Sequence, residues 1–254
     1  MYHDVVEAGD MEVSGFHGPD AARYKISRDR FKEHLDRLAA AGVSMGMLSL
    51  DGRGAEAALT FDDGGSASMV AAEELERRGW RGHFFVTTGR IGTPEFLGED
   101  QLRELAARGH VIGSHSHSHP ARMGDLEPNR LIEEWSLSRD ELERILGEPP
   151  WMASVPGGHL SEAVVRAAAR TGYRLLLTSE PSTRLRHSGD LAVLGRYAVL
   201  SSTSPGRVIG FARGAAWSCT SQRAAWRVKS FVKRRSPAAF DAARRARGLR
   251  SLER

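Results

Sequence analysis

Two short groups of residues in this chain could together hold a metal ion and move a proton. Thr60-Phe61-Asp62-Asp63 closes an apolar run, and His115-Ser116-His117-Ser118-His119-Pro120 follows about fifty residues later. A carboxylate and two imidazoles are ligands that Zn²⁺ accepts in catalytic sites, where a fourth position stays open for water. A second carboxylate beside such an ion could take a proton from that water. The two groups therefore predict metal-assisted hydrolysis.

The residues of this site are expected to have separate roles. Asp63, His115 and His119 would hold the ion, since histidines spaced i, i+4 share one side of a helical turn. Asp62 would accept the proton, because one carboxylate cannot readily be both a ligand and a mobile base. His117 would point away from the ion and be structural or solvent-exposed.

Each group also has a simpler interpretation. An Asp-Asp-Gly-Gly stretch is more often a turn with a helix cap, and a His-x-His-x-His run can be a surface cluster that binds nothing. The presence of both groups, each directly after a predicted strand, favours the metal site.

Alternating strands and helices are predicted to bring the two groups together. Ala57–Phe61 is predicted to be a short strand that stops at the acids, and residues 66–78 the helix that follows. The same alternation recurs at His83–Val86, Glu99–Arg108, Val111–Ile112, Arg130–Leu146, Trp151–Val155, Ser161–Arg170 and Tyr173–Leu177. Such repeats argue for an α/β fold with parallel strands, closed into a barrel or opened as a doubly wound sheet. In both folds the active site lies at the carboxyl ends of the strands, where Asp62, His115 and Pro156 are expected.

Length and composition are those of an ordinary globular protein. The 254 residues suffice for one large α/β domain, or for a smaller domain with an appendage. The chain has no apolar run of about eighteen residues, and Met1–Glu7 lacks the basic and apolar segments of a secretory signal. A cytoplasmic location is therefore expected. The single Cys219 excludes an internal disulfide and fits a reducing compartment.

The carboxyl-terminal end differs from the rest of the chain in charge. Residues 223–254 contain eleven basic residues and two acidic ones, which is +9, so the remainder of a chain with net charge +4 is near −5. We predict a barrel over residues 1–214 and a basic helical extension over residues 215–254. The extension could dock on the barrel through apolar residues such as Trp226, or lie at the inner face of a membrane. Its expected partner is an anionic membrane surface or a pyrophosphate-linked substrate, and not nucleic acid, because no reading motif is present.

Three stretches resemble the motifs of the polysaccharide deacetylase family, that is, the NodB-homology or chitin deacetylase-like domain of carbohydrate esterase family four. They are Leu59–Gly64, Gly82–Val86 and Gly109–Pro120, in the family's order, and the resemblance spans roughly residues 57–180. The opening Met1-Tyr2-His3 also resembles members that act on bacterial exopolysaccharide. The resemblance implies a distorted (β/α) barrel of about seven strands, here with the helical extension, and a divalent metal that is usually Zn²⁺. It further implies hydrolysis of the acetamide of an N-acetylated sugar, which could be a polysaccharide, an oligosaccharide or a lipid- or nucleotide-linked sugar.

Carried over position by position, the resemblance implies the roles that coordination chemistry also predicts. Asp62 matches the family's general base. The residues that match its metal ligands are Asp63, His115 and His119. Pro156 and Gly157 belong to Ser154-Val155-Pro156-Gly157-Gly158, which matches a motif whose backbone N–H after the proline helps to hold the developing oxyanion.

The chain departs from the family pattern at three places. Ser154 stands where an arginine normally steadies the catalytic aspartate, so another cation, such as Arg196, would have to take over. Gly157 replaces an aromatic residue of the substrate wall. The histidine that normally protonates the leaving amine is not evident, and the candidates for this role are His159, His187 and His3.

Two other functions stay open on the sequence alone. A related metal amidohydrolase could act on a non-sugar C–N bond, such as that of a cyclic imide or ureide, since the same water activation serves any amide. A catalytically degenerate carbohydrate-binding protein would also explain the missing arginine and the unidentified acid. Acetate release from N-acetylglucosamine oligomers would separate the deacetylase from both.

Overall fold

The chain folds around one curled, mostly parallel sheet. The structure, a computed structural model, describes residues 1–50 and 55–235, with side chains up to residue 228. Within these residues seven strands pair in the order β3-β4-β5-β6-β7-β9-β8, all parallel except β8, which runs antiparallel to β9. The strands are β3 (Thr60–Phe61), β4 (His83–Val86), β5 (Val111–Ser114), β6 (Met152–Ser154), β7 (Leu175–Leu177), β8 (Arg186–Ser188) and β9 (Leu191–Leu194). A separate parallel pair consists of β1 (Val5–Val6) and β2 (Ile26–Ser27).

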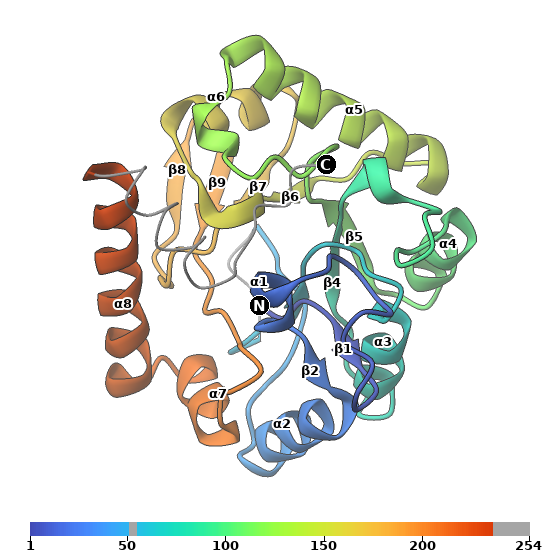
Figure 1. The fold of residues 1–254 in the computed structure, drawn as a ribbon, viewed down its shortest axis with the longest axis vertical. Helices are drawn as coiled ribbons and strands as arrows, with labels where there is room; N and C mark the ends of the chain where they lie inside the picture. Colours follow the sequence, from blue (N-terminus) through green and yellow to red (C-terminus); the bar gives the residue numbers. More distant parts are fainter. Residues whose placement is uncertain (51–54, 236–254) are drawn as a thin grey trace.

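Helices cover the outside of the curled sheet, apart from the short α1, which lies near the middle of the view in Figure 1. The helices are α1 (Pro19–Ala22), α2 (Arg28–Ala40), α3 (Ser68–Glu76), α4 (Glu99–Ala107), α5 (Pro128–Leu146), α6 (Glu162–Arg170), α7 (Pro205–Ala212) and α8 (Ala216–Arg235). Short 3₁₀ turns lie at η1 (Thr88–Arg90), η2 (Met123–Asp125) and η3 (Pro156–Gly158). Figure 1 shows α8 beside β8 and β9, and α7 contacts both α2 and α8. No helix of the described segments is both long enough and apolar enough to cross a membrane.

This architecture confirms the predicted α/β fold, a distorted barrel of about seven strands with helices outside. The predicted helix over residues 130–146 is α5, and the strand predicted at His83–Val86 is β4. The front helix, α2, begins with a cap in which the Ser27 hydroxyl accepts from the Arg30 amide, and it buries Phe31, Leu35 and Leu38 on one side. The predicted alternation is therefore present in the order that brings the ends of β3, β5 and β6 to one edge.

An aromatic stack fixes the position of β3, and hence of the acids that follow it. The rings of Phe61 and Phe84 lie 4.8 Å apart, and Tyr2 stacks on Phe61 at 5.7 Å. Tyr2 also runs alongside β3: its amide donates to Thr60 O at 2.7 Å, and its carbonyl accepts from the Asp62 amide at 3.1 Å. Since burial of each such ring stabilises by about 1.5–3 kcal/mol, the residues at the start of the chain are held firmly against the end of β3.

The extension predicted for residues 215–254 begins as α8. Gly214, with φ +63°, separates α7 from α8. Gln222 binds both backbone groups of Ala198, at 3.0 and 2.8 Å, and Cys219 is buried against the body of the protein. The part of the predicted extension from residue 236 on lies outside the described residues, and the division at residue 214 stays a prediction.

Candidate active site

Asp62 and Asp63 lie on a sharp turn at the carboxyl end of β3. Asp63 has φ +78° and Gly64 has φ +80°, so the chain reverses within two residues. A Cβ on Gly64 would lie 2.9 Å from Val86 Cγ1, and therefore only glycine fits there. The left-handed conformation of Asp63 is uncommon for a residue with a side chain. Such strain is often found where a side chain must be aimed at a functional site.

The histidines come from the loop after β5. His115 continues the pairing of β5, because its amide donates to Val86 O at 2.8 Å. Ser116 and His119 have φ +63° and +58°, so the loop is not the helical turn that the i, i+4 spacing predicted. The two left-handed residues fold it back instead, and the rings of His115 and His119 end 5.1 Å apart. Histidines at i, i+4 therefore do bring their two rings together, although the backbone between them is not helical.

Buried Glu134 of α5 holds this loop. Its carboxylate accepts bonds from the amides of His117 and Ser118, at 3.2 and 2.8 Å, and from the Ser118 hydroxyl at 2.6 Å. The half-buried ring of His117 lies away from the other two, with Nδ1 at 3.1 Å from the Thr88 hydroxyl. His117 is thus part of the loop's support, as its place between the other two histidines predicts.

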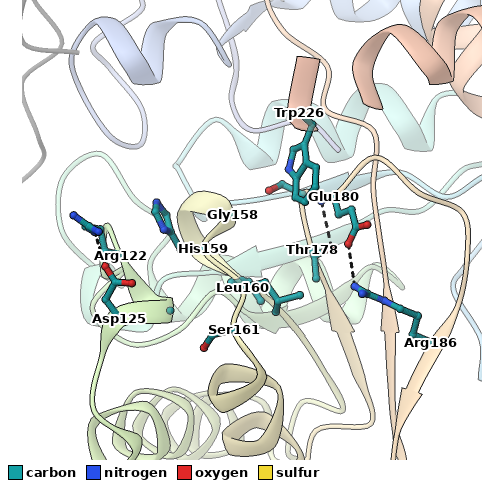
Figure 2. Close-up of a pocket in the computed structure, with 13 residues that line it drawn as sticks. Arg122, Asp125, Gly158, His159, Leu160, Ser161, Thr178, Glu180, Arg186 and Trp226 are labelled. Atoms are coloured by element: carbon teal, nitrogen blue, oxygen red, sulfur yellow. Dashed lines mark hydrogen bonds and ion pairs between the residues drawn. The ribbon is translucent and has the colours of Figure 1, made fainter. Parts of the chain in front are cut away.

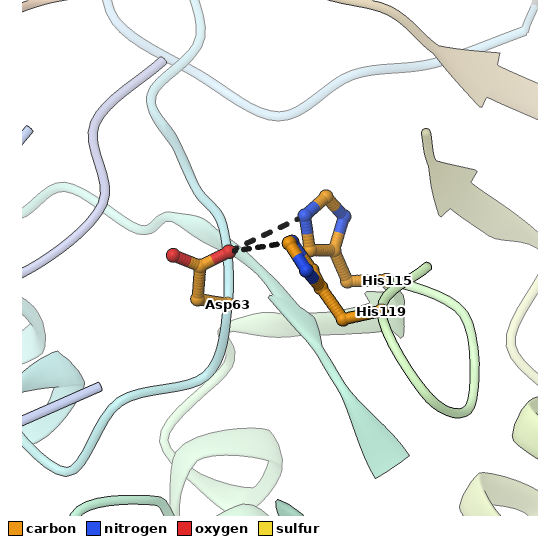
Figure 3. A group of neighbouring side chains, drawn as sticks. All are labelled: Asp63, His115 and His119. Atoms are coloured by element: carbon orange, nitrogen blue, oxygen red, sulfur yellow. Dashed lines mark ion pairs between the residues drawn. The ribbon is translucent and has the colours of Figure 1, made fainter. Parts of the chain in front are cut away.

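Asp63, His115 and His119 converge on one point (Figure 3). Asp63 Oδ1 lies 3.4 Å from His115 Nε2 and 3.5 Å from His119 Nε2. One candidate ligand atom from each residue lies within 4.8 Å of the other two. A single ion could therefore contact all three, which is the arrangement that the sequence predicts.

The chemistry of these donors fits a divalent metal. His115 Nδ1 lies 3.0 Å from Ser154 O, and because a carbonyl only accepts, this nitrogen carries the proton. In the neutral ring, Nε2 then presents its lone pair toward Asp63, as metal-binding histidines do. Burial would raise the pKa of Asp63, but His3, His115 and His119 hold it well below its usual range, so it is an anion ready to bind a cation.

Asp62 is paired with Arg196, the cation that we predict as a replacement for the missing arginine. The guanidinium makes two bonds to the carboxylate, 2.7 Å to Oδ1 and 2.8 Å to Oδ2. The Ser154 hydroxyl donates to Asp62 Oδ2 at 3.1 Å and accepts from Arg196 at 2.6 Å. The structure thus confirms the pairing, and the small side chain of Ser154 joins the same network.

This network controls the charge of Asp62. Burial favours the neutral carboxyl, but the Arg196 guanidinium and the nearby His115 outweigh this and lower the pKa of Asp62 from 3.8 to about 2. Arg196 and Ser154 use three of the carboxylate's roughly four lone-pair positions, so one position remains for another donor. Asp62 is therefore ionised, oriented and still able to accept a proton.

Replacement of Arg196 by Met is expected to lower the free energy of unfolding by about 3–5 kcal/mol, because it leaves the buried Asp62 carboxylate without its counter-ion. Urea denaturation measures this loss. Arg166→Met is the matched control: Arg166 pairs with Glu162 on the surface, where such a pair contributes at most about 1 kcal/mol. Equal stability of the Arg196 and Arg166 variants would show that the Asp62 pair is not what stabilises this edge of the sheet.

Pro156 and Gly157 lie on η3, directly after β6 and at the same edge of the sheet as the acids. Gly157 has φ +61°, and a Cβ there would approach Ala121 O to 3.1 Å. Ala121 lies two positions after His119, so the η3 turn lies beside the end of the histidine loop. The aromatic residue that the family resemblance leads one to expect at position 157 would be strained in this conformation.

The three candidate acids have different surroundings. His187 is exposed on β8, and His159 lines a pocket beside η3 (Figure 2). His3 follows Tyr2 and therefore lies next to Asp62; its Nδ1 is buried and has no hydrogen-bond partner among the described residues. Burial lowers the pKa of His3, while Asp63 and Asp62 act in the opposite direction. His3 thus combines a buried ring nitrogen with the electrostatic influence of both aspartates.

Known proteins resemble this chain in sequence and in fold. The family model for polysaccharide deacetylases matches residues 50–176. The peptidoglycan-N-acetylglucosamine deacetylase of Bacillus cereus is 26% identical over 160 residues, which cover 61% of this chain and 54% of that protein. The chain spans about half the length of the curated relatives it matches.

Solved structures repeat the fold of this chain. A polysaccharide deacetylase from Bacillus cereus superposes with a TM-score of 0.69 at 19% identity, over 83% of this chain and 67% of that one. The deacetylase PplD from Streptococcus pyogenes, solved in complex with acetate, gives 0.66 at 23% identity, over 81% of this chain and 92% of that one. At such identities these likenesses show the fold alone.

Proposed function

We propose that this chain, which belongs to the polysaccharide deacetylase family, is a metal-dependent hydrolase that converts the acetamide of an N-acetylated sugar to a free amine and acetate. One observation carries the proposal: the cluster of Asp63, His115 and His119 adjoins a separate carboxylate, Asp62, that is ionised and fixed by Arg196. A ligand set and a base side by side are what amide hydrolysis by an activated water requires.

We assign the metal to Asp63, His115 and His119, and we propose Zn²⁺ or another divalent transition metal. When bound, the ion would polarise the amide oxygen and lower the pKa of a coordinated water to about 7. Asp62 would then take a proton from the attacking water. The backbone N–H of Gly157, after Pro156, would hold the oxyanion that forms on the former carbonyl oxygen.

The leaving nitrogen needs a proton before the C–N bond breaks, and we propose that His3 supplies it. Water then gives its oxygen and one proton to the acetyl carbon and its other proton to Asp62, while protonated His3 gives one proton to the nitrogen. The C–N bond breaks, and acetic acid, which ionises to acetate, and the free amine leave. Two observations support His3: its Nδ1 is buried without a partner among residues 1–50 and 55–235, and the residue lies beside Asp62. A buried nitrogen without a partner costs about 1–3 kcal/mol, which a role toward the substrate would explain.

His3→Ala is expected to lower kcat about 10²-fold, which is the lower end of the contribution of a positioned proton donor, while metal content is unchanged. Acetate release and metal analysis on the same sample measure both. His187→Ala, on the exposed edge strand, is the control and should keep full activity. If His159→Ala is impaired instead and His3→Ala is not, the donor is the pocket histidine.

The two rival functions remain testable beside this one. The hypothesis of a degenerate carbohydrate-binding protein depends in part on the missing arginine, but Arg196 supplies that positive charge. A screen of acetylated monosaccharide, nucleotide-linked sugar, oligosaccharide and cyclic imide, with metal content measured in parallel, separates the three. Acetate from a sugar supports the deacetylase, turnover of the imide alone supports the amidohydrolase, and full metal occupancy without any turnover supports the binding protein.

The partner of the basic extension also stays a proposal. On α8, Trp217 and Val228 are 85% and 65% exposed, and they lie about three turns apart on the outer side. Such a side could rest on an anionic membrane surface. Most of the basic residues that prompted this prediction lie beyond residue 228, outside the described side chains. The cytoplasmic location likewise stays a prediction.

A further inference from the structure

The two histidines of the proposed metal site are supported in different ways. His115 Nδ1, the nitrogen that faces away from Asp63, lies 3.0 Å from Ser154 O, and this hydrogen bond fixes the ring. Metal-binding histidines almost always have such a partner. No hydrogen bond from the ring of His119 to a protein group is present in residues 1–50 and 55–235, although its amide donates to Ser116 Oγ at 3.1 Å. Within the described chain, the orientation of the His119 ring therefore depends on packing.

Phe16 packs against the ring of His119. The two ring centroids lie 4.5 Å apart, and the ring planes are inclined by 40°. The other aromatic neighbour of His119 in the described segments is His115, at 5.1 Å, which is itself a proposed ligand. Phe16 is only 9% exposed, so its ring is confined where it meets the imidazole. A confined ring at this distance limits the rotation of the imidazole against it.

The place of Phe16 is not explained by the core. The ring belongs to none of the packed apolar clusters of the described residues. Its second aromatic contact is with Phe96, edge to face at 5.1 Å and 74°. Phe96 pairs with Gly65, two positions after Asp63, in a short antiparallel bridge. The two phenylalanines therefore connect the loop that carries His119 with the turn that carries Asp63.

The segment that carries Phe16 is itself held in place. It leaves the sheet after β1 and returns at β2, and the pairing of these two strands closes it. The Ser14 hydroxyl donates to Asp4 Oδ1 and accepts from the backbone at the start of α3, both at 2.9 Å. The Gly15 amide donates to Glu95 O at 2.7 Å. Because the two residues before Phe16 are both bonded, its ring is presented to His119 in one position.

We infer that Phe16 is a positioning residue, whose ring holds the imidazole of His119 with Nε2 directed toward Asp63 and the metal. The segment between β1 and β2 then takes part in the metal site without supplying a ligand. The inference rests on the proposed function, because it takes His119 as a ligand. It adds a residue that lies outside residues 50–176, the part of the chain that the family model matches.

The test is the Zn²⁺ affinity of the metal-free, full-length protein, measured by calorimetric titration without substrate. Phe16→Leu keeps an apolar side chain but removes the ring, so the imidazole must be ordered when the metal binds. We expect the affinity to fall about 3- to 10-fold, which is what ordering one side chain typically costs. The absorption spectrum of the Co²⁺-loaded protein depends on the geometry of the ligands and should change as well. Phe16→Tyr keeps the ring and should restore both quantities.

Phe211→Leu is the matched control. Phe211 is 8% exposed, stacks on Tyr197 at 5.1 Å and has the Arg207 guanidinium 5.7 Å from its ring. Phe16 likewise has the Arg90 guanidinium 5.8 Å from its ring. The same substitution thus removes a similar ring contact at a tyrosine instead of a histidine. The Zn²⁺ affinity and the Co²⁺ spectrum of Phe211→Leu should equal those of the wild type.

The outcomes separate the inference from the proposed function. If Phe16→Leu binds Zn²⁺ as the wild type does and its Co²⁺ spectrum is unchanged, the inference is wrong and the metal assignment stands. Equal losses in Phe16→Leu and Phe211→Leu would reveal general damage to the fold and would also overturn it. If the wild type binds Zn²⁺ but releases no acetate from any sugar, the deacetylase is wrong, while a specific loss in Phe16→Leu still supports the inference. A wild type that binds no Zn²⁺ would overturn both.

Discussion

Asp62→Asn is expected to lower kcat for acetate release by about 10³- to 10⁴-fold while the protein keeps its metal. Asparagine has nearly the shape of aspartate, so the turn after β3 and the ligand Asp63 are retained. It cannot accept a proton from water at neutral pH, however, and the attacking water then stays neutral. Metal analysis and acetate release on the same preparation measure the two quantities together.

The control for this substitution must separate loss of a base from loss of structure. Asp140→Asn makes the same chemical change on the exposed side of α5 and should leave both turnover and metal content at the wild-type level. In Asp62→Asn, Arg196 loses its counter-ion, so a drop in stability is expected beside the drop in kcat. Substantial turnover by Asp62→Asn would show that another residue is the base. If the variant loses both its metal and its turnover, the role of Asp62 is to position the metal ligands.

The parts of the fold that the sequence predicts are those in which apolar residues recur at a clear helical or strand spacing. Helix α5 shows apolar residues at helical spacing over 19 residues and ends at Gly147 in the left-handed conformation, which a pattern of residues can reveal. The short edge elements lack such signals. Strand β8 is exposed at Arg186 and His187, and β1 has two residues, so their pairing depends on neighbours far away in the chain.

The same division applies to the site. Ligand identity follows from residue type and spacing, and the cluster of Asp63, His115 and His119 was therefore predictable. The path of the histidine loop was not, because the left-handed conformations of Ser116 and His119 depend on bonds to Glu134, a residue of another element.

Contacts between distant residues carry no local signal. Arg196 lies 134 positions after Asp62, and only a gap in the family's motif pointed to it. His3 reaches the site because Tyr2 pairs with β3, and this pairing cannot be predicted from hydrophobic periodicity. A buried stretch that pairs in parallel with β3 from far away in the sequence can be found only from the fold.

His115→Ala is expected to weaken Zn²⁺ binding and to abolish activity. Loss of a residue that only hydrogen-bonds to a metal ligand typically weakens binding about 10- to 100-fold, and loss of a ligand itself should weaken it more. The variant loses one of three ligands and also the Nδ1 donor to Ser154 O, so the remaining pair cannot fix the ion's geometry. Calorimetric titration of the metal-free protein with Zn²⁺ measures this without reference to any substrate. His117→Ala is the matched control, since that ring lies in the same loop but bonds to Thr88 and supplies no ligand atom; the variant should keep most of the Zn²⁺ affinity. Because the two histidines are two positions apart on one loop, a difference between them cannot arise from general damage to the loop. Equal affinity of both variants would place the metal elsewhere, and the assignment of Asp63, His115 and His119 would then have to be abandoned.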